Sequence, residues 1–221
     1  MKNSPDKRTR FVQLILDWGK KNKRSFPWRK DATPYKVLLA EILLQRTPAN
    51  RVSEYFPRFV KKFPKPQSII LTNIEDVKNF FQPLGLKKRA EWLVRLMNEI
   101  CVKYDCEIPN QESELTELPG VGLYTARAVM CFGFDKNVAI VDVNVARVLS
   151  RVFGITQVKR PSENSELWRF AETLLPKECT KLYNEALLDF SALICKKGPL
   201  CKLCSVRDYC NYYQNIITTS M

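Results

Sequence analysis

The segment that defines the fold lies at residues 118–126 and reads LPGVGLYTA. Its two glycines, Gly120 and Gly122, let the backbone take a positive φ and approach a ligand closely. Helical patterns flank it at residues 112–117 and 123–132, and the N-terminus of the second helix would present unpaired N–H groups. Taken alone, a Gly-x-Gly pair more often marks a plain turn between helices. In a basic chain, the segment indicates a hairpin that binds a DNA phosphate without a charged side chain.

The helical pattern continues on both sides of this hairpin. Apolar residues recur at three- and four-residue steps on one face of an amphipathic helix, namely Leu86, Ala90, Leu93, Val94, Met97 and Cys101. Similar patterns predict helices near residues 8–22, 34–47, 50–62, 74–81, 143–153, 164–175 and 180–194. No run alternates long enough to predict a strand. The predicted fold class is therefore all-α.

The composition points to a polyanionic partner. The 221 residues include 36 Lys and Arg against 23 Asp and Glu, a formal net charge of +13. Excess positive charge of this size favours nucleic-acid binding, although the basic run in the first thirty residues could also be a solvated helix face. The chain has no His, which excludes Ser–His and Cys–His nucleophiles and every His-ligated metal site.

The location of the protein can also be predicted from the sequence. No apolar run near the N-terminus resembles a signal peptide, and no segment approaches the ~20 apolar residues that span a bilayer. We therefore expect no membrane association and a place in the cytoplasm, with the nucleoid, or in the nucleus. Thiols stay reduced there, so the eight cysteines are expected to be ligands or buried thiols rather than a disulfide framework.

A cluster of cysteines near the C-terminus predicts a metal-binding loop. Four thiols lie within sixteen residues: Cys195, Cys201, Cys204 and Cys210. A four-thiolate zinc site usually has two Cys-x2-Cys pairs, and only one is present, so an iron–sulfur cluster is favoured over zinc or unliganded thiols. The other four are expected to be small apolar core residues: Cys101, Cys106, Cys131 and Cys179.

Two carboxylates stand in unusual surroundings. Glu41 lies inside the apolar run 37–44, where burial would disfavour its charged form; the alternative is an exposed residue on a half-buried helix. Asp142 follows the apolar run 138–141 and precedes the helix predicted at 143–153. Asp is a good N-cap, so Asp142 could be a helix cap, a catalytic group, or both.

These motifs together resemble the helix-hairpin-helix DNA glycosylases related to endonuclease III and the MutY-type adenine glycosylases. The resemblance runs over nearly the whole chain and is closest to the small mismatch-specific thymine glycosylases. Its elements occur in the family's order: FPWR at 26–29, EILLQRT at 41–47, LGL at 84–86, the hairpin, VDVNVARV at 141–148, DFS at 189–191 and the four cysteines.

The resemblance implies two α-helical domains that flank a DNA-binding cleft. Residues 30–137 would form a helical barrel that carries the hairpin. Residues 1–29 and 138–221 would form a second domain, with a 4Fe–4S cluster on the four C-terminal cysteines. The family's first Cys gap is usually six residues, and here it is five. The implied partner is double-stranded DNA containing a mismatch, bound by a monomer.

The resemblance also assigns roles to individual residues. A target base must be flipped out of the duplex, and Arg46 and Leu86 would fill the gap. Asp142 would stabilise positive charge on the sugar, and Glu41 would handle protons. Tyr124 stands where the lyase members carry a catalytic Lys, which implies hydrolysis without strand cleavage. The implied DNA contacts are Gln45, Arg46, Leu86, Gly120, Val121, Gly122 and Asn144.

Three functions remain open at this stage. The first is a monofunctional glycosylase acting on thymine or uracil opposite guanine, favoured by Arg46 and Tyr124. The second is an adenine glycosylase, suggested by Gln45 and by the surroundings of Glu41. In that branch an extra C-terminal domain recognises 8-oxoguanine, whereas only 11 residues follow Cys210 here. The third is a catalytically silent DNA-binding module in which Asp142 is only a cap.

Overall fold

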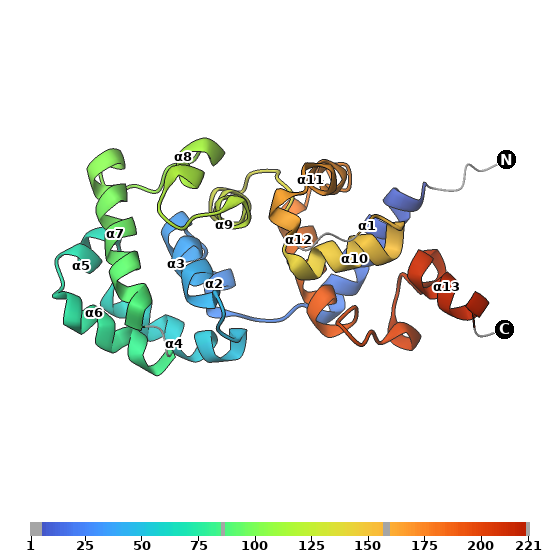
Figure 1. Ribbon diagram of the computed structural model, residues 1–221, viewed down its shortest axis with the longest axis horizontal. Coiled ribbons are helices and arrows are strands. Elements are labelled where there is room, and N and C mark those ends of the chain that lie inside the picture. The colour runs from blue at the N-terminus through green and yellow to red at the C-terminus, as the bar shows by residue number, and fades with distance from the viewer. Residues whose placement is uncertain (1–5, 85–86, 157–159, 220–221) are drawn as a thin grey trace. The chain divides into compact units, whose positions relative to one another are not determined.

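The computed structural model describes residues 6–84, 87–156 and 160–219. Within these ranges it consists of helices and turns and contains no strand, so the all-α prediction is confirmed (Figure 1). The chain divides into a middle unit, Ser25–Lys136, and a terminal unit formed by Met1–Arg24 and Asn137–Met221. The family resemblance predicted that the middle unit would begin at residue 30 and end at residue 137. No helix in the described ranges is long and apolar enough to cross a membrane.

The middle unit is a bundle around one hydrophobic core. Helix α3 (Pro34–Leu44) is its central element, because it is buried on every side from Val37 to Leu43. Helices that cover a core have one apolar stripe, and α4 (Ala49–Lys62) shows this with Val52, Phe56 and Phe59 buried. The other elements are α2 (Pro27–Lys30), α5 (Pro66–Ile70), α6 (Ile74–Phe81), η1 (Gln82–Leu84), α7 (Lys87–Tyr104), α8 (Glu112–Glu117), α9 (Leu123–Ala128) and the π-helical turn η2 (Val129–Gly133).

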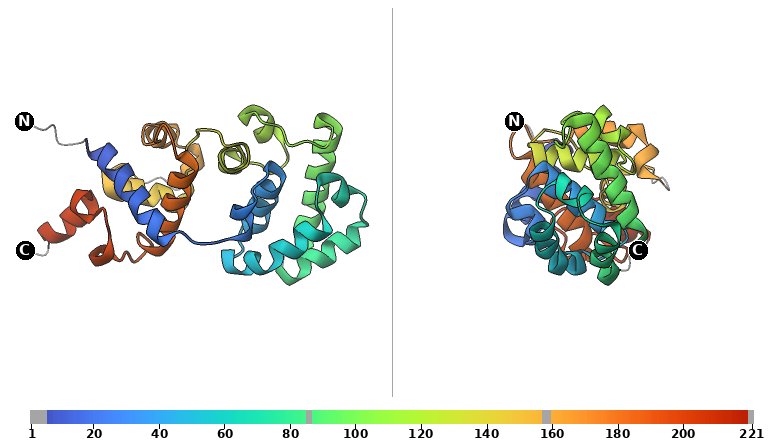
Figure 2. Two further views of the ribbon diagram at one scale, coloured as in Figure 1. Left: turned by 180° about the vertical axis from the view of Figure 1, so that it is seen from behind. Right: turned by 90° about the vertical axis from the view of Figure 1, so that its left-hand side faces the viewer.

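The terminal unit is built on the pair α1 (Lys7–Asn22) and α12 (Thr180–Leu193), which lie against each other (Figure 2). A Cβ atom on Gly19 would lie 2.3 Å from the Cβ of Ala186, so a larger residue on α1 would push the helices apart. Trp18 meets Phe190 edge to face, with ring centroids 5.2 Å apart. The other elements are α10 (Val143–Phe153), η3 (Pro161–Glu163), α11 (Ser165–Glu172), η4 (Cys201–Leu203), η5 (Arg207–Tyr209) and α13 (Asn211–Thr219).

The helix predicted at residues 34–47 is shorter than expected. It ends at Leu44, and Arg46 has a left-handed backbone with φ of 56°. The physical reason is Pro48. A proline disfavours helical geometry in the residue before it, which is Thr47 here, so the helix cannot continue to residue 47. Gln45 and Arg46 therefore lie on a tight turn between α3 and α4.

The expectation for the isolated cysteines was partly wrong. Cys131 is buried, as predicted, but Cys179 is exposed, and Cys101 and Cys106 form a disulfide. Helix α7 ends at Tyr104, and the next two residues, Asp105 and Cys106, both have positive φ. This turn folds the chain back onto the last turn of α7, which brings Cys106 to Cys101. Sequence spacing alone does not reveal such a reversal.

Candidate functional site

The predicted hairpin is present between α8 and α9. Its apolar side chains face inward, since Leu118 and Val121 are almost fully buried and the Val121 N–H donates to the Leu118 carbonyl at 3.1 Å. Gly120 has φ of 72°, and a Cβ there would lie 1.7 Å from the ring of Trp92. Gly122 is different, because nothing lies within 4 Å of the position its Cβ would take. Gly120 is therefore needed for packing against Trp92, whereas the backbone at Gly122 is open to an approaching ligand.

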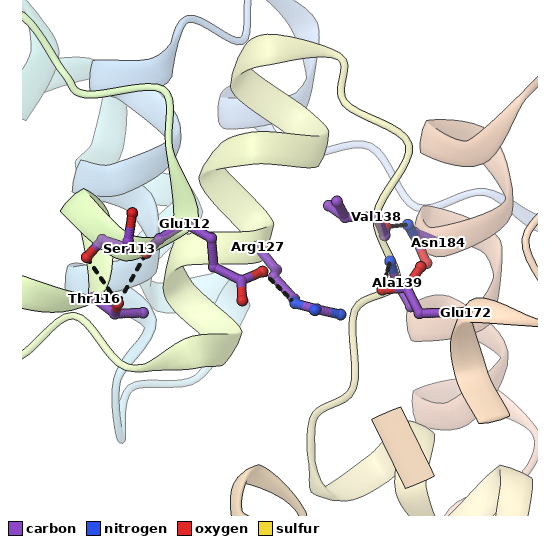
Figure 3. Close-up of polar contacts among 8 residues, drawn as sticks. All are labelled: Glu112, Ser113, Thr116, Arg127, Val138, Ala139, Glu172 and Asn184. Carbon is purple, nitrogen blue, oxygen red and sulfur yellow. Dashed lines mark hydrogen bonds and ion pairs between the residues drawn. The ribbon is translucent and has the colours of Figure 1, made fainter. Parts of the chain in front are cut away.

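The two helices of the hairpin are held together by polar contacts. The Arg127 Nε on α9 donates to a carboxylate oxygen of Glu112 on α8 at 2.7 Å (Figure 3). The Thr116 hydroxyl bonds back to the carbonyls of Glu112 at 2.8 Å and Ser113 at 3.0 Å, which tightens α8. Only the Arg127–Glu112 bond joins the two helices, because the Thr116 bonds lie within α8. The hairpin is therefore held by a contact between its helices, and Gly122 stays open to a ligand.

The turn after α3 gathers two guanidinium groups. Arg46 is exposed, and Arg89, on α7, donates to the carbonyl of Ile42 in the last turn of α3 at 3.3 Å. Burial, followed by the positive charge of Arg46, lowers the pKa of the Arg89 guanidinium. The two cations are thus close enough to repel, an arrangement that suits a phosphate or another anion. Arg89 was not singled out from the sequence, because a basic residue on a helix carries no local signal.

Two other predicted residues lie in the middle unit. Glu41 is only 9% exposed on the buried helix α3, so it is not the exposed residue of the alternative interpretation. Tyr124 lies half-buried in the first turn of α9, two residues after Gly122. Gln45 is half-buried at the end of α3. Leu86, the predicted wedge, falls outside the described residues.

Asp142 caps the N-terminus of α10 in the terminal unit. One of its oxygens accepts hydrogen bonds from the backbone N–H groups of Asn144 at 2.9 Å and Val145 at 2.7 Å. The other accepts from the side-chain amide of Asn144 at 2.9 Å. The side chain remains partly exposed. The capping role is confirmed, and the same bonds hold a negative charge in a fixed orientation at the unit's surface.

A chain of hydrogen bonds connects this carboxylate to the cysteine loop. The amide oxygen of Asn144 accepts from Arg147 at 2.9 Å. Arg147 in turn donates to the carbonyls of Cys195 at 2.9 Å and Ser191 at 3.1 Å. Asn144, expected to contact DNA, is therefore also the link between Asp142 and the start of the loop.

All four C-terminal cysteines line one pocket of the terminal unit, together with Arg151, Phe190 and Tyr212. Arg151 donates to the carbonyls of Lys196 at 2.7 Å and Lys197 at 3.0 Å, which closes the loop against α10. Burial raises the pKa of the Cys204 thiol to about 11 and also raises those of Cys201 and Cys210. Without a cation these thiols stay protonated, whereas four thiolates on one pocket suit a polynuclear metal group.

The four cysteines line the same pocket, but in the described part of the chain no three or more His, Cys, Asp or Glu side chains lie close enough together to hold a metal ion.

Fold and motifs identify the family. Residues 39–172 match the model of the HhH-GPD superfamily base excision DNA repair proteins. That segment contains the hairpin, Glu41 and Asp142. The chain belongs to this family, and the predicted resemblance is confirmed.

Two individual relatives match nearly the whole of this chain. The chain is 37% identical to a thymine/uracil-DNA glycosylase of Methanothermobacter thermautotrophicus, over 96% of this chain and 97% of that protein. It is 35% identical to an adenine DNA glycosylase of Buchnera aphidicola, over 92% of this chain and 60% of that protein.

Solved structures give the same answer for the fold. A thermostable thymine-DNA glycosylase superposes with a TM-score of 0.90 at 37% identity, over 95% of this chain and 97% of that one. An endonuclease III–DNA covalent intermediate superposes with a TM-score of 0.78 at 23% identity, over 95% and 98% of the two chains. The predicted endonuclease III-like fold is confirmed.

Proposed function

We propose that this protein hydrolyses the N-glycosidic bond of thymine or uracil opposite guanine in double-stranded DNA. The observation that carries the proposal is Asp142, a surface carboxylate fixed by three N–H donors within a segment that matches the family. Similarity to a thymine/uracil-DNA glycosylase over nearly the whole chain supports the choice of base. The enzyme would act as a monomer wherever the cell keeps its DNA, in the cytoplasm or the nucleus.

Asp142 would supply electrostatic stabilisation. As the bond to the base breaks, positive charge develops on the sugar, and a nearby carboxylate lowers the energy of that state. The capping bonds from Asn144 and Val145 hold the carboxylate in place before substrate arrives, so little reorganisation is needed during the reaction.

Glu41 and Tyr124 would complete the chemistry. Glu41 lies on a rigid buried helix, where it could move a proton at the leaving base or the attacking water. Tyr124 offers a phenol at the position where a lyase needs an amine. Without that amine no covalent bond to the sugar forms, so the product would be an intact strand with an abasic site.

This mechanism predicts a strand that breaks only after alkali. We expect a G:T duplex to release thymine and to stay unbroken on a denaturing gel until heated with base. Trapping with borohydride should give no protein–DNA adduct, because no Schiff base forms. Spontaneous cleavage together with a trapped adduct would contradict the monofunctional assignment while leaving base excision in place.

DNA recognition would use the open side of the hairpin and the turn after α3. Gly122 lets the backbone come close to a phosphate, and Arg46 with Arg89 adds positive charge. Arg46 is exposed on a left-handed turn, a conformation that costs about 1–2 kcal/mol for a residue with a side chain. Local strain of this kind is common at functional sites, and we propose that Arg46 enters the gap left by the flipped base.

We expect Arg46→Ala to slow single-turnover excision about tenfold, the equivalent of ~1.4 kcal/mol. Binding to a fully matched duplex should fall less, because a plug is used only when a base is extruded. Lys62→Ala, which removes one exposed positive charge from α4, is the matched control and should affect both duplexes equally. Equal losses for Arg46→Ala on matched and mismatched DNA would show that Arg46 is an ordinary phosphate contact.

We further propose that the four C-terminal cysteines hold a 4Fe–4S cluster. When bound, such a group would offset the negative charge of the thiolates and cross-link the loop; the four cysteines lie within residues 195–210 and line one pocket. Arg147 and Arg151 hold the first cysteine's segment against α10. The cluster would therefore stabilise the helix that carries Asp142.

The purified protein should be brown, with a broad absorption band in the visible. Iron and acid-labile sulfide should each be present at about four per chain. Cys204→Ser should lower both and reduce thermal stability, whereas Cys131→Ser, a buried thiol of the middle unit, should leave the iron content unchanged. Stoichiometric zinc without sulfide would contradict the cluster and leave the fold assignment standing.

A further inference from the structure

A cavity of about 360 Å³ is lined entirely by residues of the middle unit, none of which has a part in the proposed base excision. Pockets that hold small molecules begin at about 300 Å³. Separate segments of the chain meet around it, namely residues 33–35, 64–67, 106–108 and Phe134. The first two include the starts of α3 and α5, and the third follows α7. The cavity therefore arises from the packing of the unit and not from one loop.

One half of the Cys101–Cys106 disulfide belongs to this cavity. Cys106 is among the lining residues and Cys101 is not, although both are half-buried. The bond joins residues only 5 apart in the sequence, and a cross-link that closes a short loop restrains the unfolded chain least. Disulfides of proteins that work among reduced thiols are mostly transient, catalytic or redox-sensing. This bond therefore suits exchange with a molecule in the cavity better than a purely structural role.

Two opposite charges stand at the same cavity. The exposed side chains of Lys65 and Glu107 both line it, and no ion pair among the described residues involves either of them. Ile108 and Phe134 add apolar surface. A cation and an anion at one cavity complement a small molecule that carries both a carboxylate and an ammonium group. Amino acids and short peptides have this combination of charges.

We propose that the cavity binds low-molecular-weight thiols of the amino-acid kind and that Cys106 is the residue to which they become attached. The thiolate of the ligand attacks the Sγ of Cys106 and forms a new S–S bond, while the bond to Cys101 breaks and Cys101 leaves as a thiolate. One disulfide replaces another, so no oxidant or reductant is consumed. Attack by Cys101 on the same sulfur reverses the step and releases the ligand. This site does not depend on the proposed function.

The test compares two variants that both lose the disulfide. Cys101→Ser leaves Cys106 as a free thiol at the cavity, and Cys106→Ser leaves Cys101 outside it. Each variant is treated with glutathione disulfide and, separately, with the uncharged hydroxyethyl disulfide. The ratio of the two rates, compared between the variants, cancels the intrinsic reactivity of each thiol and of each reagent. Mass spectrometry locates the adduct, because trypsin cleavage at Lys103 puts the two cysteines on different peptides.

The ratio of the glutathione rate to the neutral rate should be about fivefold higher for Cys106 than for Cys101, an effect the size of one or two exposed ion pairs. Adding Lys65→Gln to Cys101→Ser should lower the ratio about threefold. Lys62→Gln, the control, removes an exposed charge that does not line the cavity and should leave the ratio unchanged. Equal ratios at the two cysteines, or equal effects of the two lysine variants, would overturn the proposal.

The wild type is measured as well, which also covers the case in which a serine variant does not fold. The protein is exposed briefly to reduced glutathione and quenched with acid, and its free thiols are alkylated before digestion. Glutathione should be found on the peptide that contains Cys106, and the alkyl group on the peptide that contains Cys101. The reverse assignment would contradict attack from the cavity.

Discussion

Asp142→Asn should bind mismatched DNA nearly as well as the wild type and excise the base at least a hundredfold more slowly. Loss of a preorganised electrostatic group typically costs about 3 kcal/mol in the transition state. Asn is about as good an N-cap as Asp, so the backbone bonds from Asn144 and Val145 can persist. The substitution therefore removes the charge and keeps the helix. Single-turnover rates and binding titrations on one G:T duplex measure the two effects separately.

The matched control exchanges the same two residue types at another cap. Asn164 caps α11 by accepting from the Leu167 N–H at 3.0 Å. Asn164→Asp should keep both stability and excision close to the wild type. Asp142→Ala loses the cap as well as the charge and should also unfold more easily, by ~1 kcal/mol. An excision rate for Asp142→Asn near that of the wild type would leave Asp142 as a helix cap only.

Gly120→Ala should destabilise the protein by about 3 kcal/mol and abolish tight DNA binding. A residue with a Cβ strains the positive φ at this position by roughly 1–2 kcal/mol, and displacing the Trp92 ring adds about 1–3 kcal/mol. The added Cβ would lie 1.7 Å from that ring, so the hairpin or α7 must move. Chemical denaturation and DNA titration under the same conditions measure the two losses.

Gly122→Ala is the control within the same hairpin. Its φ is −84°, and the space around its Cβ position is open, so stability should stay within about 1 kcal/mol of the wild type. DNA affinity should nevertheless fall if a phosphate approaches this backbone. Unchanged stability for Gly120→Ala would contradict the packing against Trp92, and unchanged affinity for Gly122→Ala would place the phosphate elsewhere.

The helical framework could be predicted because its signal is local. The 3.6-residue period places Ala90, Leu93 and Met97 on the buried face of α7, and Asp142 signals the start of α10. Short helices such as α5 (Pro66–Ile70) have too few turns to show a period. The disulfide at Cys106 escaped prediction because it depends on a chain reversal by two residues with positive φ.

Only those residues of the candidate site that lie in recognisable sequence motifs could be predicted. Motif order placed Asp142 and the four cysteines, and the structure shows how Asn144 and Arg147 connect them. Arg89 could be recognised as part of the candidate site only from its position beside Arg46 in the structure. Helix α12 buries polar side chains such as Asn184 and Asp189, but its sequence has the pattern of an ordinary amphipathic helix. Their partners are more than 40 residues away along the chain, a separation that periodicity cannot detect.

The choice of base is tested most directly by parallel single-turnover excision on four duplexes that differ only at the target pair: G:T, G:U, A:G and A:8-oxoguanine. The proposed function predicts release of thymine and uracil opposite guanine, with abasic strands that break only after alkali. Asp142→Asn, run beside the wild type, should lose this activity on both duplexes. Preferential release of adenine from the A:G or A:8-oxoguanine duplex would contradict the assignment to thymine and uracil.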